Sequence, residues 1–344
     1  MTRSRRHRTQ RWAGLAIALA ASALVAAPAR AKEVLKVATL APQGSVWDTS
    51  MRALGARWAK ESGGAVELRL YPGGVAGDES DVVRKMRIGQ FQGAALTVTG
   101  LAEIEPAFGV FQIPLLFASW SELEHVLERL EPELTRRLEA KGYRLLLWAH
   151  GGWVHLFSRS PIRTLEDLKR QKLFVWAGDD AQVQRWRRGG FQPVPLAATD
   201  VTMGFQTQMI DVVPTTPIAA LTLQWYRQTP YMQGLGLAPL VGGVIVKGDA
   251  WERIPGAQRG ALVTAAADAE RALAAEVPRQ DAGAIEQMRQ RGLEVVEVSA
   301  EEDAEWRREA VEFTRETREA AVPREILAAA QDAIAEFRAA EGSP

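Results

Sequence analysis

Few side chains in this sequence have the type and spacing that a metal site or a catalytic site needs. Four histidines are present, and the two closest, His150 and His155, lie in a strand-like stretch. Their odd spacing points the two rings to opposite faces of a strand, so they are unsuited to sharing a zinc ion. His7 lies in the N-terminal segment, and His125 stands alone. We expect the histidines to be structural, and we expect neither a bound metal nor a cofactor.

The sequence also lacks the local motifs of common enzyme classes. It contains no glycine-rich Lys-Ser/Thr phosphate loop and no Gly-x-Ser-x-Gly nucleophile elbow. Gly234-x-Gly236 resembles the start of a dinucleotide fingerprint, but the third glycine is missing. With no cysteine in the chain, disulfides and thiolate chemistry are excluded. The sequence therefore disfavours an enzyme, and an unusual hydrolase is the weakest alternative because no nucleophile and base can be paired.

Residues 1–31 have the pattern of an export signal. Five arginines form a basic head, Trp12 to Ala27 is an apolar run, and Ala29-Arg30-Ala31 is a small-x-small cleavage site. The signal carries six of the 42 basic residues and none of the 42 acidic ones, so the mature chain has a net charge of about −6. This charge argues against nucleic acid or an anionic membrane as partner. We expect a periplasmic protein that does not insert into the membrane after cleavage.

Beyond residue 31, apolar strand patterns alternate with amphipathic helical patterns. The first strand patterns are Val34–Leu40, Val66–Tyr71 and Gly93–Val98, separated by helical patterns at Ser45–Ser62 and from Ser80. This order predicts an α/β fold with a parallel sheet covered by helices. A capping box, Ser121-x-x-Glu124, predicts the start of a further helix. At 344 residues the chain exceeds the size of most single cores, which favours two lobes.

Several segments resemble, in the right order, the motifs of solute-binding proteins of tripartite ATP-independent periplasmic (TRAP) transporters, DctP type. The segments are Ser62–Glu79 (SGGAVELRLYPGGVAGDE), Phe108–Phe117 with its IPLLF ending, Ile162–Lys169, Phe205–Asp211 and Trp251–Pro255. Together they cover nearly the whole mature chain. The resemblance implies two lobes, each a mostly parallel sheet flanked by helices and joined by hinge strands. It also implies a ligand enclosed between the lobes and delivery to a TRAP membrane permease with small and large subunits.

The resemblance also predicts where the lobes begin and which residues meet the ligand. The first lobe is expected at residues 32–152 plus 241–285, and the second at 153–240 plus 286–344. Ligands of such sheets lie beyond the carboxyl ends of the strands, so the loops there should face the cleft. The predicted ligand-binding residues are Gln43, Trp47, Trp153, Val154, Phe174, Trp176, Thr215 and Thr216.

The sequence departs from the family at the arginines that hold a ligand carboxylate. The family's Lys-x-Arg-x-Pro segment aligns with Lys172-Leu173-Phe174-Val175-Trp176, so a phenylalanine replaces the arginine. A second arginine of some acid-binding members aligns with Val154, and the asparagine that follows "vD" aligns near Thr215. The acidic residue and tryptophan of a metal-dependent branch are also absent from the segment after Asp211. We interpret the chain as an atypical branch whose ligand is neutral or largely apolar.

Three alternatives remain open for this site. Phe174 and Trp176 could simply pack in a core. Arg159, Arg185 or Arg187 could instead supply a guanidinium group from a new direction. If capture has been lost, the chain would be a ligand-free scaffold or a sensor-input protein on the same fold.

Overall fold

A computed structural model describes residues 32–178 and 180–342, so the predicted signal peptide lies outside the described residues. The first elements are β1 (Glu33–Thr39), α2 (Val46–Glu61), β2 (Val66–Tyr71), α3 (Glu79–Arg87), β3 (Gly93–Thr97), α4 (Val98–Ile104), the 3-10 helix η1 (Pro106–Gln112), α5 (Trp120–Ala140) and β4 (Tyr143–Ser158). There follow α6 (Leu165–Lys169), β5 (Lys172–Trp176), α7 (Asp180–Arg188), β6 (Gln192–Leu196), η2 (Ala198–Asp200), α8 (Val201–Gln206), β7 (Val212–Thr215), α9 (Pro217–Thr222), η3 (Trp225–Arg227) and β8 (Tyr231–Gln233). The last are β9 (Ala238–Lys247), α10 (Gly248–Arg253), α11 (Gly256–Arg289), β10 (Glu294–Val296), α12 (Ala300–Ala321) and α13 (Arg324–Glu341).

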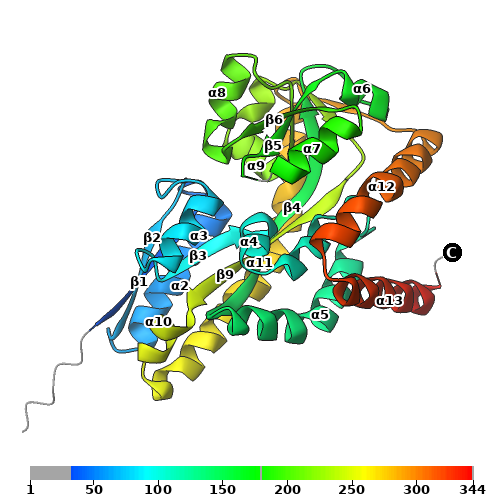
Figure 1. Ribbon diagram of the computed structural model, residues 1–344. Coiled ribbons are helices and arrows are strands. Elements are labelled where there is room, and N and C mark those ends of the chain that lie inside the picture. The colour runs from blue at the N-terminus through cyan, green and yellow to red at the C-terminus, as the bar shows by residue number, and fades with distance from the viewer. Residues whose placement is uncertain (1–31, 179, 343–344) are drawn as a thin grey trace, which may run out of the picture. The chain divides into compact units, whose positions relative to one another are not determined.

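The strands form a mixed sheet in the order β2-β1-β3-β9-β4-β7-β5-β6. β1 pairs in parallel with β2 and β3, and β5 pairs in parallel with β6 and β7. Between these groups run the long antiparallel neighbours β4 and β9 (Figure 1). Residues 143–154 of β4 pair with β9, and residues 155–158 pair with β7. The predicted α/β class, with mostly parallel sheets flanked by helices and joined by hinge strands, is confirmed.

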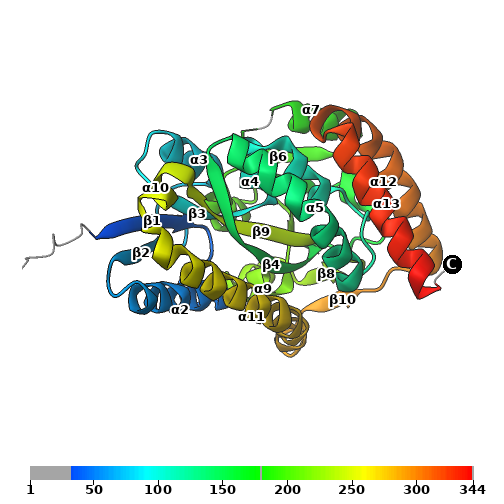
Figure 2. The same cartoon turned by 90° about the horizontal axis from the view of Figure 1, so that it is seen from below.

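We call β1–β3, β9, residues 143–154 of β4 and their helices the first lobe, and β5–β8, β10 and residues 155–158 the second lobe. Each lobe has two clusters of buried apolar side chains. In the first lobe, Trp58 of α2 is fully buried and its Nε1 donates to the Leu262 carbonyl oxygen of α11 at 3.0 Å. α11 also packs along β4 and reaches α9 (Figure 2). A single long helix therefore packs against the hinge strand β4 and against α9 at the base of the second lobe.

Helix α5 begins two residues earlier than the sequence predicts. Ser119, not Ser121, has the extended backbone of an N-cap, and its side chain accepts from Glu122 N at 3.1 Å. Glu122 in turn accepts from Ala118 N at 2.9 Å. The predicted box at Ser121 and Glu124 was wrong because the same Ser-x-x-Glu spacing occurs two residues earlier. The earlier N-cap places Glu122 in a buried position and leaves Glu124 exposed.

The C-terminal helix α13 packs with the first lobe. Ile326, Ala330 and Ile334 are buried in the same apolar cluster as side chains of α5 and β3. The predicted second lobe included residues 286–344, and the structure differs at this end. α12 leads from the second lobe, where Trp306 Nε1 donates to the Arg163 carbonyl oxygen at 2.6 Å, to α13. Amphipathic periodicity gives the buried face of a helix but not the surface it covers.

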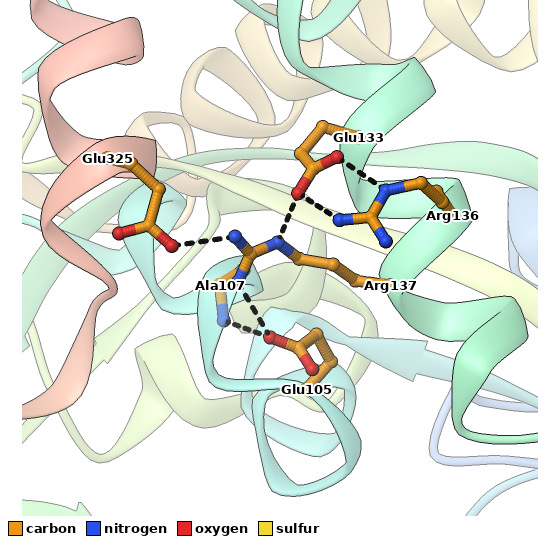
Figure 3. A network of polar contacts seen from close by, with 6 residues as sticks. All are labelled: Glu105, Ala107, Glu133, Arg136, Arg137 and Glu325. Atoms are coloured by element: carbon orange, nitrogen blue, oxygen red, sulfur yellow. Dashed lines mark hydrogen bonds and ion pairs between the residues drawn. The ribbon is translucent and has the colours of Figure 1, made fainter.

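A group of charged side chains fastens α13 to α5 and η1 (Figure 3). Arg137 of α5 donates from Nη2 to Glu325 Oε1 of α13 and from Nε to Glu133 Oε1, each at 2.7 Å. Its Nη1 lies 3.7 Å from Glu105 Oε1 at the start of η1. Nearby, Arg338 of α13 makes two bonds, of 2.7 and 3.0 Å, to the buried carboxylate of Glu122. We call these residues the outer ion-pair group.

Candidate ligand-binding cleft

A cleft of about 1510 Å³ lies where the strands of both lobes end. From the first lobe, its walls include Pro42 after β1 and Val98 after β3. From the second lobe they include Ala177 after β5 and Pro214 of β7, while His150 and other residues of β4 and β9 contribute from the hinge. The positions after β1, β3 and β5 follow the carboxyl ends of parallel strands, where open α/β sheets bind ligands. The volume exceeds the roughly 300 to 1,000 Å³ of most small-molecule sites.

The two lobes touch at the loop before α3. Asp78, the N-cap of α3, accepts from Glu79 N through Oδ1 and from Ala198 N of the second lobe through Oδ2, at 2.8 and 2.9 Å. Beside it, Gly74 has φ +74°, and a Cβ there would lie 2.7 Å from Thr199 Cγ2. Only glycine fits both the backbone and the close approach. The loop thus makes one hydrogen bond from lobe to lobe and brings Gly74 close to the Thr199 side chain.

A buried carboxylate, Glu79, organises the first-lobe wall of the cleft. Its oxygens accept from Thr97 N and Thr97 Oγ1, both at 2.7 Å, and from Gly100 N at 2.8 Å. Burial raises the pKa of Glu79 to about 7, although these hydrogen bonds act in the opposite direction. Glu79 therefore holds the first turn of α4 against α3. The sequence motif that ends at Glu79 signalled the family but not this role.

A second buried carboxylate, Asp281 of α11, holds the hinge. It accepts from Trp153 N at 2.9 Å and from Ile218 N of α9 at 3.1 Å. The pairing of β4 with β9 shifts between His150 and Gly152, and Gly152 has φ +104°. A Cβ on Gly152 would lie 2.8 Å from Asp281 Oδ1, so glycine is required. Burial raises the pKa of Asp281 to about 6.

Five of the eight predicted ligand-binding residues line the cleft: Trp47, Val154, Phe174, Trp176 and Thr215. Trp47 is fixed by a bond from its Nε1 to the His150 carbonyl oxygen at 2.8 Å. Phe174 is buried, and its ring meets Trp176 edge-on with centroids 5.9 Å apart. The two rings also belong to the second-lobe core or pack against it. Core packing and cleft lining, considered as alternatives for Phe174 and Trp176, are both present in the structure.

The other three predicted residues do not line the cleft. Gln43 lies exposed in the turn before α2. Trp153 packs edge-on against Trp120 at 5.3 Å, because neighbours on a strand point to opposite faces and Val154 takes the cleft side. Thr216 is fully buried as the N-cap of α9 and accepts from Ala219 N at 3.4 Å. The placement of these three residues therefore differs from the prediction.

The arginines considered as replacements for the missing carboxylate-binding arginines differ in whether they line the cleft. Arg159 does not line the cleft: it donates to the Phe205 carbonyl oxygen, and its Nε lies 3.8 Å from Asp211 Oδ1. Arg187 is exposed and also lies outside the lining. Arg185 and Arg188 of α7 do line it, and both already interact with other groups of the chain. Of the candidates, Arg185 alone faces the right space.

The three histidines of the described residues differ in their surroundings. His155 is buried and satisfied, with Nδ1 2.9 Å from the Gln233 carbonyl oxygen. His125 lies between α5 and α13, with its ring centroid 5.6 Å from that of Phe337. His150 lines the cleft, is only 4% exposed, and has no hydrogen-bond partner for Nδ1 among the described residues. Burial lowers the pKa of His150, so its ring is held neutral. The sequence patterns gave no reason to separate His150 from the other two.

Residues 32–178 and 180–342 contain no group of three or more His, Asp or Glu side chains that could hold a metal ion. In the same part of the chain, no helix is both long and apolar enough to span a bilayer. Two α/β lobes joined by long antiparallel strands, with a cleft at the carboxyl ends of their strands, define the class of two-lobed solute-binding proteins.

Comparison with known proteins specifies the family. Residues 37–320 match the model of "Bacterial extracellular solute-binding protein, family 7", DctP, and the chain belongs to this family. It is a family of solute-binding proteins of TRAP transporters rather than of enzymes. The predicted resemblance to DctP-type proteins is confirmed at this level.

Individual relatives are distant. The chain is 21% identical over 275 residues to a solute-binding protein of Verminephrobacter eiseniae, covering 79% of this chain and 81% of the relative. It is 25% identical over 166 residues to the uncharacterized protein YiiZ of Salmonella typhimurium, and this match covers 47% of the chain and only half of YiiZ. A solved TRAP periplasmic solute-binding protein from Ralstonia eutropha, with bound (S)-2-acetolactate, superposes with a TM-score of 0.82 at 20% identity, covering 89% of this chain and 99% of the other. This likeness shows the shared fold.

Proposed function

We propose that this protein is a periplasmic receptor that captures a small, neutral or largely apolar organic molecule and delivers it to a TRAP membrane permease. The family supports capture and delivery. The observation that carries the ligand class is the position of Phe174. The resemblance places Phe174 at the arginine of the family's Lys-x-Arg-x-Pro segment and Val154 at the second arginine position. Both residues line the cleft.

The balance of desolvation and pairing favours an apolar ligand. A carboxylate enclosed beside Phe174 and Val154 would lose water without gaining a guanidinium fork, and an unpaired buried charge costs several kcal/mol. An apolar body gains about 25 cal/mol for each Å² removed from water, and the rings of Trp47 and Trp176 offer it wide faces. The Ralstonia eutropha protein was solved with a carboxylate. An acid in the present cleft would have to draw Arg185 or Arg188 away from interactions they already make.

Calorimetry on matched neutral and acidic compounds tests the ligand class. Wild type should bind the neutral member of each pair more tightly, and Phe174→Arg should reverse that order because it restores a guanidinium group on β5. Met203→Arg is the matched control: it adds the same charge to an exposed position of the second lobe, outside the cleft lining. Tight binding of a simple acid by wild type, unchanged in Phe174→Arg, would contradict the proposal and point to Arg185.

Capture itself is tested without knowing the ligand. Protein purified without refolding should release a small molecule that mass spectrometry can identify. Small-angle scattering should show a smaller radius of gyration with that molecule than without it, because a ligand that contacts both lobes favours their closure. No released molecule and no compaction would instead support the ligand-free scaffold.

A further inference from the structure

The glycine-rich loop at the end of the Ser62–Glu79 motif is fixed to its own lobe. Gly73 N donates to the Ala41 carbonyl oxygen, just after β1, at 2.9 Å. Lys85 Nζ of α3 donates to the Ala76 carbonyl oxygen at 2.5 Å. Both bonds stay within the first lobe, so they hold the loop in position whether or not the lobes touch.

Asp78, the last residue of this loop, bonds to both lobes through its two carboxylate oxygens. Oδ1 accepts from Glu79 N of its own lobe at 2.8 Å, and Oδ2 accepts from Ala198 N of the second lobe at 2.9 Å. The residue is only 8% exposed, so little water competes for the bond between the lobes. An amide that donates to a carboxylate also makes a stronger bond than one that donates to a neutral group.

Ala198 N needs an acceptor from outside its own lobe. Ala198 opens the 3-10 helix η2, and the first amides of a helix have no acceptor within the helix. Ala197, which precedes it, is extended and has no side-chain oxygen to cap the turn. Asp78 therefore caps α3 in the first lobe and η2 in the second lobe at the same time.

This contact lies at one edge of the cleft. Gly73, Ala198 and Thr199 line the cleft, and Gly74 lies so close to Thr199 that a Cβ would overlap the threonine side chain. An opening of the cleft at this edge separates Asp78 from Ala198 N. Because both bonding groups belong to the protein, the free energy of their bond is the same for every ligand.

We propose that Asp78 is a positioning residue for lobe closure, which holds the receptor closed by capping one helix in each lobe and does so without touching the captured molecule. The inference rests on the proposed function and adds to it a source of affinity outside the ligand contacts. The apparent affinity of a receptor with two states scales with the fraction of molecules in the binding-competent state. Asp78 therefore raises the affinity for every ligand by one common factor and slows release.

Asp78→Ser separates the two bonds of this residue. Serine is a good N-cap and suits α3, but its side chain is one bond shorter and does not reach Ala198 N as well. Two neutral fluorescent probes, N-phenyl-1-naphthylamine and 2-naphthol, report binding to the cleft. Both should lose the same factor in affinity, about tenfold, and both should be released faster in stopped-flow measurements.

Asp249→Ser is the matched control. Asp249 Oδ1 accepts from Ala250 N at 2.8 Å, which is the same local bond that Asp78 makes to Glu79 N. Asp249 lies at the start of α10 and outside the cleft lining. The control removes the same charge and the same local bond, and it should leave both affinities and both release rates unchanged.

Ala198→Pro removes the donor instead of the acceptor. Proline lacks the N–H, its φ suits the first position of a helical turn, and the extended Ala197 tolerates a following proline. Alone, this variant should weaken both probes by the same factor as Asp78→Ser. The double variant should bind no more weakly than either single variant, because both substitutions remove one shared bond. A double variant that shows the product of two losses would overturn the inference.

A distance measurement without any probe separates this inference from the proposed ligand class. The chain has no cysteine, so spin labels at Val263→Cys in the first lobe and Met209→Cys in the second lobe are unique, and both positions are exposed. Pulsed EPR should show a population with a short distance between the lobes, and this population should shrink in Asp78→Ser and in Ala198→Pro. If neither probe binds wild type but the population shrinks, the ligand class fails and the role of Asp78 stands.

Two results count against the role of Asp78 and leave the apolar receptor standing. The first is an unchanged distance distribution in both variants, whatever the probes do. The second is a loss of affinity that is confined to one probe or shared by Asp249→Ser, because lobe closure acts on both probes equally and the control lies outside the contact between the lobes.

Discussion

The cleft side of the protein and its outer side are held together by different kinds of polar contact. On the cleft side, Glu79 and Asp281 are buried and accept hydrogen bonds from backbone amides, and neither has an ion pair with a cation among the described residues. On the outer side, Arg137 pairs with several carboxylates, including Glu133 and Glu325, which are partly exposed. The first kind joins α3 to the start of α4 and α11 to β4 and α9, and the second joins α13 to α5.

The difference determines how each side responds to its environment. A buried carboxylate without a cation has a raised pKa, so its charge changes near neutral pH, and each bond it makes acts in a medium of low dielectric constant. Exposed ion pairs keep their charges over that range but are weakened by salt. We therefore expect pH to act on the cleft and hinge and ionic strength to act on the α5 and α13 contact.

The largest expected effect comes from Glu79→Ala. The substitution leaves Thr97 N and Gly100 N without their acceptor in a buried setting, and each such donor costs about 1 to 3 kcal/mol, so unfolding free energy should fall by about 3 to 5 kcal/mol. Urea denaturation measures it. Glu124→Ala, at an exposed position of α5, is the control and should change stability by less than about 0.5 kcal/mol. A loss below 1 kcal/mol for Glu79→Ala would show that Glu79 does not hold α4.

The next effect is a pH dependence caused by Glu79. Its folded pKa of about 7 lies above the ordinary value of 4.5, so the folded state keeps a proton that the unfolded chain loses first. The resulting contribution to stability is fully present below pH 4.5 and is lost as pH rises through 7. Its size is on the order of 3 kcal/mol. Comparison of wild type with Glu79→Gln between pH 4.5 and 7.5 should show a steeper fall in wild type, because the variant keeps only the slope caused by Asp281, and parallel curves would refute it.

A smaller effect is expected for Asp281→Asn at the hinge. An asparagine can accept through one oxygen, so one of the two amides, Trp153 N or Ile218 N, loses its bond at a cost of about 1 to 2 kcal/mol. The variant also removes a carboxyl with a raised pKa of about 6, so stability should become less pH-dependent between pH 4 and 6. Asp332→Asn, exposed on α13, is the control. Equal effects of the two substitutions on stability would show that Asp281 does not stabilise the hinge.

The smallest effect is expected in the outer ion-pair group. Arg137→Gln breaks the contacts to Glu133 and Glu325 but leaves the apolar packing of α13 intact, so the loss should be less than about 1 kcal/mol. The difference from wild type should disappear in 1 M NaCl, where the screening length is about 3 Å. A loss that persists in high salt would mean that the group is not mainly electrostatic.

The sequence predicted the helices and strands better than the contacts between them. The βαβα order of the first lobe follows from apolar runs such as Val34–Leu40 and Val66–Tyr71, and these became β1 and β2 nearly as expected. The position of α13 could not be predicted in the same way. Its apolar positions show that one face is buried, but contact with α5, about 190 residues away along the chain between Arg137 and Glu325, depends on tertiary packing.

In the cleft, too, the sequence predicted the segments better than the direction in which single side chains point. Family resemblance placed Val154, Phe174 and Trp176 on the lining. It could not distinguish Trp153 from Val154, because strand alternation decides which neighbour faces the cleft. Asp281 was missed for a related reason. Its role depends on the irregular pairing of β4 with β9, and it meets Trp153 from a helix 128 residues further along the chain.

The hydrogen bond from Ala198 N to Asp78 Oδ2 forms only when the two lobes are in contact, so it reports on that contact. Its donor belongs to one lobe and its acceptor to the other, so this amide proton is shielded from solvent exchange only while the lobes touch. Its exchange rate with deuterium therefore measures the fraction of time that the lobes spend in contact. One backbone amide in the second lobe can thus report the equilibrium between open and closed receptor, with no attached probe and no substitution.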